Sequence, residues 1–166
     1  MESEIEEWRT IEDFPNYEVS NIGRCRRIGS TACLKPLTTV NGYFLIALYK
    51  NGIPIKRGVH RLVASAFIAN PQNKPFVDHK NRKPQDNCVS NLRWASIAEN
   101  TANSKKNNLL GFRGVYKNRK RYEASIRINK KLYHLGTYDT PEEAALMYDA
   151  AAIGAFGEFA TLNFTE

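Results

Sequence analysis

Residues 77–100 read VDHKNRKPQDNCVSNLRWASIAEN, and from them we predict the fold of the centre of the chain. Two short β-rich runs, Phe76-Val77 and Leu92-Arg93-Trp94, flank a polar loop and indicate two strands. Ser96 and Glu99 then match a capping box, which predicts that a helix follows. We therefore expect two strands joined by a loop, with a helix after them.

Three polar residues of this stretch suit the hydrolysis of a phosphodiester, which needs a hard cation and a base. Asp78 supplies an anionic oxygen ligand, and His79 has a side chain that exchanges protons near neutral pH. Asn100 adds a carbonyl oxygen, and one carboxylate plus one amide suits Mg²⁺. Because strand neighbours point to opposite faces, a local distortion or loop is needed before Asp78 and His79 can serve one site. Taken alone, the residues leave a structural role for His79 open.

The segment before this stretch is rich in predicted strands. Residues 43–49 form a β-rich run, and Asn51-Gly52 after it is a favoured pair for a tight hairpin turn. Apolar residues at helical spacing over 59–67 predict a helix, which Asn70-Pro71 ends. We expect a small β-rich module over 1–55.

The segment from residue 111 predicts a sheet followed by a helix. Three strands are expected over 112–116, 122–127 and 131–135. Thr140 and Glu143 match a second capping box at the start of the helix. The apolar stripe that covers the sheet is expected to comprise Ala144, Met147, Tyr148 and Ala151.

The 166 residues carry a net charge of +7, which is unevenly distributed. Residues 1–13 hold six acids and one base, whereas 14–110 hold 15 bases and four acids. Residues 111–135 hold eight bases and one acid, and 136–166 hold six acids and no base. The blocks indicate a positive working face with the acidic segments turned away from it, and therefore a polyanionic partner. The tyrosines that lie among the basic residues favour nucleic acid over a membrane surface as the partner.

Several other classes are disfavoured. No apolar run approaches the roughly 18–20 residues of a membrane span, and the acidic N-terminus is unlike a secretory signal. The three cysteines, Cys25, Cys33 and Cys88, form no C-x-x-C pair, which disfavours a disulfide scaffold and a four-cysteine zinc site. We expect an intracellular protein.

The motifs at the centre of the chain resemble the HNH homing endonucleases of phages. They are VHRLVA at 59–64, AFI at 66–68, NP at 70–71, VDH at 77–79, DN at 86–87, SNLRW at 90–94 and EN at 99–100. The resemblance implies a core of two strands, one helix and a metal, with His79 as general base and Asp78 and Asn100 as ligands of Mg²⁺ or Mn²⁺. Asn91 would hydrogen-bond across the loop and hold the base in place. Since the family more often has His at the third position, Asn100 is the less certain ligand.

Both flanks add to the resemblance. Residues 8–24 are similar to a module that often precedes HNH cores. Residues 111–164 resemble the plant Apetala2 DNA-binding domain, through FRGV at 112–115, SIR at 125–127, LGTY at 135–138 and LNF at 162–164. In that family the sheet enters the major groove of DNA. The residues that we expect to contact DNA are Arg113, Tyr116, Lys117, Arg119, Lys120, Arg121, Arg127 and His134. Tyr116 and His134 replace an Arg and a Trp of the plant proteins, so the plant sequence preference does not carry over.

Together these features predict an α+β fold with four segments. They are a β-rich nuclease-associated module over 1–55, an HNH ββα-metal core over 56–104, a linker over 105–110, and an Apetala2-like domain over 111–166 in which a three-stranded antiparallel sheet packs on one helix. The predicted function is metal-dependent cleavage of double-stranded DNA. The alternative is a sequence-specific DNA-binding regulator with an inactive HNH scaffold. We expect no membrane, no small-molecule cofactor, a monomer, and the cytoplasm of a phage-infected bacterial host.

Overall fold

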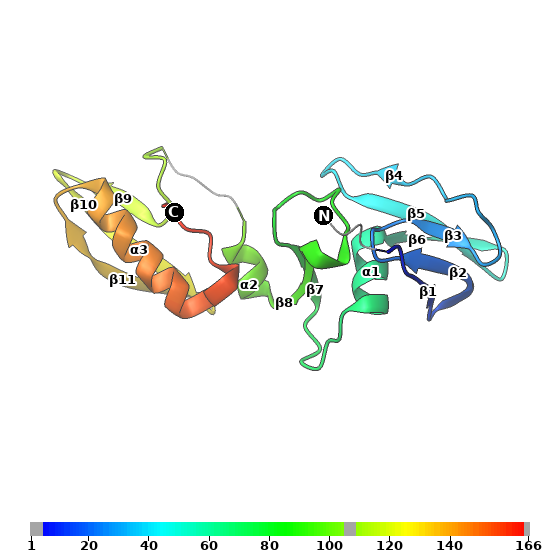
Figure 1. The fold of residues 1–166 in the computed structure, drawn as a ribbon. Coiled ribbons are helices and arrows are strands. Elements are labelled where there is room, and N and C mark those ends of the chain that lie inside the picture. The colour runs from blue at the N-terminus through cyan, green and yellow to red at the C-terminus, as the bar shows by residue number, and fades with distance from the viewer. Residues whose placement is uncertain (1–4, 105–108, 165–166) are drawn as a thin grey trace. The chain divides into compact units, whose positions relative to one another are not determined.

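The computed structural model describes residues 5–104 and 109–164, which form α-helices and antiparallel sheets (Figure 1). The strands are β1 (Trp8–Ile11), β2 (Phe14–Ser20), β3 (Cys25–Arg27), β4 (Leu37–Thr38), β5 (Phe44–Lys50), β6 (Ile53–Gly58), β7 (Phe76–His79), β8 (Leu92–Ala95), β9 (Val115–Asn118), β10 (Arg121–Ile128) and β11 (Lys131–Tyr138). The helices are α1 (Val59–Phe67), α2 (Ile97–Ala102) and α3 (Pro141–Phe156), with short 3₁₀ helices η1 (Val89–Asn91) and η2 (Gly157–Phe159). The mixture confirms the predicted α+β class.

The chain divides into two compact units between Ala95 and Ser96. The first unit contains β1 to β8 and α1, and the second contains α2, β9 to β11 and α3. Of the predicted linker over 105–110, residues 105–108 lie outside the described part of the chain. Helix α2 belongs to the second unit, although the prediction placed it in the catalytic core.

One hydrophobic core holds the first unit together. Its buried side chains come from the N-terminal sheet β1-β2-β3, from the sheet β4-β5-β6, from α1 and from the ribbon β7-β8. Val19, Leu48 and Val63 are fully buried at its centre. The predicted β-rich module and the two strands of the predicted nuclease core therefore share their apolar interior.

The Asn51-Gly52 turn forms as predicted. Both residues have positive φ, 53° and 78°, as a two-residue hairpin turn of the favoured twist requires. The turn joins β5 to β6 with Lys50 opposite Ile53. The chain then continues into α1, which packs its buried residues on the same core.

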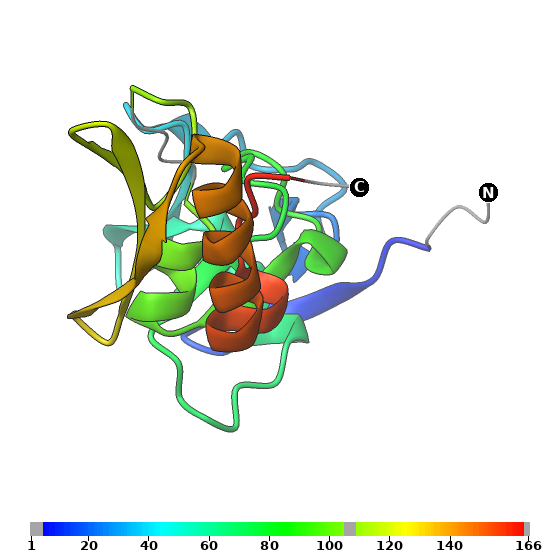
Figure 2. The same cartoon turned by 90° about the vertical axis from the view of Figure 1, so that its left-hand side faces the viewer.

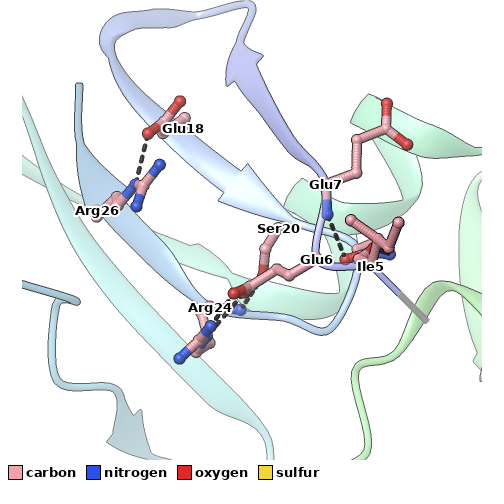
Figure 3. A network of polar contacts seen from close by, with 8 residues as sticks. Ile5, Glu6, Glu7, Glu18, Ser20, Arg24 and Arg26 are labelled. Carbon is pink, nitrogen blue, oxygen red and sulfur yellow. Dashed lines mark hydrogen bonds and ion pairs between the residues drawn. The ribbon is translucent and has the colours of Figure 1, made fainter. Parts of the chain in front are cut away.

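Acidic side chains of the N-terminal segment pair with arginines of their own module (Figure 3). Arg24 Nε donates to Glu6 Oε1 over 2.7 Å, and Arg26 Nε donates to Glu18 Oε1 over 2.5 Å. Glu6, which precedes β1, thus neutralises Arg24, which lies between β2 and β3. Whether the acidic segments are turned away from a positive working face remains a prediction.

In the second unit, α3 covers one face of the sheet β9-β10-β11 (Figures 1 and 2). The capping box at Thr140 and Glu143 is present as predicted. Ala144 and Tyr148 are buried, but Met147 is 43% exposed, so the predicted stripe is wrong at that position. Neither α3 nor any other helix in the described residues is long and apolar enough to cross a membrane.

The first strand of this sheet begins three residues later than predicted, at Val115. Gly114 has a φ of +73°, which takes the chain out of an extended conformation. A side chain at Gly114 would also collide with the ring of Tyr148 and lie 2.8 Å from the Ser125 carbonyl oxygen. Arg113 therefore lies before the sheet, in a turn.

Candidate active site

Strands β7 and β8 form an antiparallel ribbon that carries Asp78 and His79 next to each other. Asp78 lies opposite Arg93, and His79 lies opposite Leu92. Both Asp78 and His79 are only 5% exposed. The strand includes both residues, whereas the prediction placed its end at Val77. As neighbours in an extended strand, the two side chains have different partners.

Asp78 is paired with a buried arginine. Arg93 Nε donates to Asp78 Oδ2 over 2.9 Å, and Arg93 is 9% exposed. A buried charge is costly unless it is paired and hydrogen-bonded, so each residue makes the burial of the other tolerable. Carboxylate oxygens are the ligands that hard cations such as Mg²⁺ prefer. Asp78 therefore suits a hard cation as an oxygen ligand while Arg93 fixes its orientation.

His79 is held by an asparagine of the loop. Its Nε2 lies 3.2 Å from Oδ1 of Asn87, which is 4% exposed. Burial lowers the pKa of His79 below its ordinary value, and the bond from Asn87 and the charges of Asp78 and Asp86 oppose that shift. Burial thus favours the uncharged imidazole, which is the form that a general base needs before it accepts a proton.

A second histidine lies against the first. The ring centroids of His60 and His79 are 5.4 Å apart, and Tyr43 lies 5.2 Å and 5.8 Å from them respectively. Burial, with the charges of His79 and Arg61, lowers the pKa of His60 to about 4. Its Nδ1 is buried and has no hydrogen-bond partner among the described residues. The ring of His60 is thus uncharged near neutral pH and packs against the ring of the candidate base.

Asn91 ties together two parts of the loop between the strands. Its Oδ1 accepts from the Asn81 backbone N–H over 3.0 Å, and its Nδ2 donates to the Asp86 carbonyl oxygen over 2.8 Å. Its own carbonyl oxygen accepts from the Lys80 N–H over 2.9 Å. The cross-loop bonds are of the kind that the prediction required, and the role of Asn91 in catalysis remains a prediction.

The turn between β2 and β3 packs against the same loop. The Val89 N–H donates to the Asn21 carbonyl oxygen over 2.7 Å. A Cβ on Gly23 would lie only 2.7 Å from the Cβ of Asn87, the residue that holds His79. The N-terminal module therefore supports the candidate site directly, and Gly23 is required for the close approach.

Asn100 lies on α2, in the second unit. The helix begins at a complete capping box, in which Ser96 accepts from the Glu99 N–H and the Glu99 carboxylate accepts from the Ser96 N–H. No group of three or more His, Cys, Asp or Glu that could hold a metal occurs in the described residues.

The predicted DNA-contacting residues of the second unit, apart from Arg113, are exposed. Three of them share the sheet face opposite α3: Tyr116 pairs with Glu123, His134 pairs with Ser125, and Arg127 follows two residues after Ser125. Paired residues lie on the same face of an antiparallel sheet, and alternate residues of a strand do so too. The exposed basic residues at or beside the β9–β10 turn are Lys117, Arg119, Lys120 and Arg121.

Arg113 is placed differently. Its Nε donates to the Tyr148 hydroxyl over 2.8 Å, and its Nη2 donates to the Thr101 carbonyl oxygen over 2.9 Å. Its Nη1 donates to the Ser104 carbonyl oxygen. The guanidinium is directed at α2 and α3 and lies outside the exposed set.

Arg93, Asn87 and Tyr43 belong to the candidate site but were not predicted from the sequence. Arg93 carried a usable signal, because a charge inside a short apolar strand indicates a buried partner. Asn87 belongs to the DN pair of the resemblance, but it was given no role, because spacing does not distinguish it from the other asparagines of the loop. Tyr43 reaches His79 only through the tertiary fold.

Comparison with known proteins agrees with this geometry. Residues 6–52 match the NUMOD4 motif, and residues 57–102 match the HNH endonuclease family. An uncharacterized HNH endonuclease of Acanthamoeba polyphaga mimivirus is 37% identical over 105 residues, which are 63% of this chain and 32% of that protein. The DNA endonuclease I-HmuI of Bacillus phage SP01 is 37% identical over 98 residues, which are 58% of this chain and 56% of I-HmuI.

The structure agrees as well. The solved structure described as DNA binding and cleavage by the HNH homing endonuclease I-HmuI matches with a TM-score of 0.55 and 37% identity, over 58% of this chain and 56% of that one. A 40-residue stretch, 24% of this chain, is 50% identical to an ethylene-responsive transcription factor-like protein of Arabidopsis thaliana and covers 18% of it. The matches thus cover about half of the phage protein and smaller shares of the mimivirus and plant proteins.

Proposed function

Because the chain carries a NUMOD4 motif followed by an HNH endonuclease domain, as in HNH homing endonucleases, we propose that it is a metal-dependent endonuclease of double-stranded DNA. The observation that carries the proposal is a buried imidazole beside a buried carboxylate, each with its own hydrogen-bond partner. His79 and Asp78 are adjacent on β7, inside the matched HNH domain, and each is fixed by its own partner. This is the pair that hydrolysis of a phosphodiester requires.

His79 is proposed as the general base. Its imidazole accepts a proton from the water whose oxygen attacks phosphorus, and the bond between phosphorus and the leaving oxygen then breaks. Asn87 fixes the ring at Nε2, and Asn91 keeps the loop that bears Asn87 in one conformation. His60 and Tyr43 line the ring and limit its exposure to water.

Asp78 and Asn100 are proposed to hold a divalent metal, Mg²⁺ or Mn²⁺. When bound, such a metal stabilises the negative charge that develops on the phosphate and on the leaving oxygen. Arg93 keeps the Asp78 carboxylate in place and compensates its charge in the apolar interior. Asn100 is supported as a ligand by its place in the segment that matches the HNH family.

The second unit is proposed to bind the DNA substrate through the exposed face and turn of its sheet. Arg127, His134 and Tyr116 would meet the bases, since arginine pairs with guanine edges in the major groove. The lysines and arginines of the β9–β10 turn would contact phosphates, which adds affinity without specificity. The short likeness to a plant transcription factor-like protein supports this part of the proposal.

The same likeness supports the second candidate, a DNA-binding regulator that does not cut. Incubation of supercoiled plasmid with the full chain and Mg²⁺ or Mn²⁺ decides between the two. We expect nicked or linear DNA from the wild type and none from His79→Ala, with equal DNA binding by both proteins in EDTA. Binding without cleavage under either metal, on DNA that carries the bound sites, would favour the regulator.

A further inference from the structure

The side chain of Arg113 joins the end of α2 to the body of the second unit. Thr101 lies in the last turn of α2, and Ser104 follows two residues after its end; Arg113 donates to the carbonyl oxygens of both. The Thr101 carbonyl oxygen also accepts from the N–H and the hydroxyl of Ser104, so Arg113 adds a charged donor to this end of the helix, where a cation also interacts favourably with the helix dipole. The third bond, from Nε to the Tyr148 hydroxyl, anchors the guanidinium to α3.

The backbone of Arg113 is fixed as firmly as its side chain. Its N–H donates to Asn163 Oδ1 over 2.6 Å, and its carbonyl oxygen accepts from Asn163 Nδ2 over 3.1 Å. Asn163 is held in turn by Asp149, which is 6% exposed and accepts from both the backbone and the side chain of Asn163. The backbone of Arg113 is thus held by a polar network that consists of Asn163 of the C-terminal segment and the buried Asp149 of α3.

Helix α2 depends on such support. It has six residues, and a helix of that length is unstable by itself in water. The capping box of Ser96 and Glu99 satisfies its first turn, and Arg113 donates to the Thr101 carbonyl oxygen in its last turn. The helix also contacts α3 and η2. Both of its ends are therefore fixed by specific polar contacts.

We propose that Arg113 is a positioning residue, which clamps α2 to the DNA-binding unit and so keeps Asn100 in order. Asn100 precedes Thr101, the residue that Arg113 binds. The catalytic consequence rests on the function proposed above, in which Asn100 is a metal ligand. Arg113 would accordingly contribute to cleavage and not to the reading of bases.

The first test measures amide hydrogen exchange in the full chain without metal or DNA. Arg113→Met removes the guanidinium and keeps the apolar stem, and Arg127→Met on the exposed face of β10 is the matched control. We expect Arg113→Met to speed exchange in α2 by about tenfold, since bonds from a charged donor are worth about one such factor or more. The amides of β10 should keep their wild-type rates, and Arg127→Met should leave α2 within about twofold.

Two results would overturn the clamp. One is exchange in α2 within about twofold of the wild type in Arg113→Met. The other is that Arg113→Met loses exchange protection in β10 as well as in α2, and that Arg113→Lys loses protection in the same two elements. Arg113→Lys keeps the positive charge but not the planar guanidinium. Arg113 would then be a core residue of the whole unit.

The second test measures cleavage at saturating DNA and the DNA concentration that gives half of that rate. We expect Arg113→Met to lower the saturating rate about tenfold or more, with less than about a threefold change in half-saturation. Arg127→Met should show the reverse pattern. The same pattern for both variants would refute a positioning role. If the wild type does not cleave at all, the proposed function fails, whereas the exchange test still decides the clamp.

Discussion

The pair of Asp78 and Arg93 allows a quantitative test that separates folding from catalysis. Asp78→Ala leaves the buried guanidinium of Arg93 without that carboxylate, and Arg93→Met leaves the carboxylate without its arginine. Removing one member of a buried ion pair costs about 3–5 kcal/mol. The bond is 2.9 Å long, and the two residues are 5% and 9% exposed, so we expect losses in this range.

The double variant should behave differently from the sum of its parts. Replacing both members of a buried pair with apolar groups is often neutral, because two burial penalties disappear together. We expect Asp78→Ala with Arg93→Met to be more stable than either single variant, and within about 2 kcal/mol of the wild type. Urea unfolding followed by tryptophan fluorescence is a suitable assay, since both tryptophans, Trp8 and Trp94, lie in the first unit.

Cleavage then gives the second half of the test. If Asp78 is a metal ligand, the double variant folds and binds DNA but does not cut, so that its inactivity cannot be ascribed to unfolding. A loss of less than about 1 kcal/mol in Asp78→Ala would refute the reasoning about the buried pair. Cleavage by the stable double variant would refute the assignment of Asp78.

Three further outcomes are expected. His79→Ala should reduce cleavage by about 10²–10⁴-fold with DNA affinity nearly unchanged, which a binding assay in EDTA and a plasmid assay measure together. In the folded protein the pKa of His60 is lowered to about 4, so on acidification the unfolded chain protonates this histidine first. Up to about 3 kcal/mol of the free energy of unfolding should therefore be lost between pH 6.5 and 4. Urea titrations over this pH range should show a shallower loss in His60→Phe. Gly23→Ala should lower both stability and cleavage more than Gly29→Ala does. Both glycines have positive φ, 84° and 79°, but only a Cβ at Gly23 would meet Asn87. Equal effects of the two substitutions in unfolding and cleavage assays would contradict that contact.

Local signals predicted most of the secondary structure. Both capping boxes and the Asn51-Gly52 turn depend on residues close in sequence, so their chemistry is visible without a fold. The errors arose where a distant residue decides the conformation. The strand expected over 112–116 loses its first three residues, because Gly114 must pass close to Tyr148 of α3.

The candidate site shows the same division. Asp78 and His79 were predicted because adjacent carboxylate and imidazole groups suggest chemistry wherever they occur. Arg93 is 15 residues from Asp78 and meets it only through the register of β7 and β8. Asn87 was one of several loop asparagines, and only the tertiary fold shows that it contacts His79. Partners of reactive groups are thus harder to predict than the groups themselves, since they depend on register and packing.

The placement of the arginines changes what the net charge of +7 means for DNA binding. Arg24 is paired with Glu6 beside the N-terminal sheet, Arg93 is paired with Asp78 in the core, and Arg113 donates to a carbonyl oxygen in the last turn of α2. Positive charges that already pair with groups of the same protein contribute little to the release of counterions from DNA. Among the described residues of the second unit, exposed cations lie on the sheet and at both of its hairpin turns, as Arg127, Lys120 and Lys130 illustrate. The distribution of exposed charge, and not the total, therefore identifies the surface of that unit that DNA would meet.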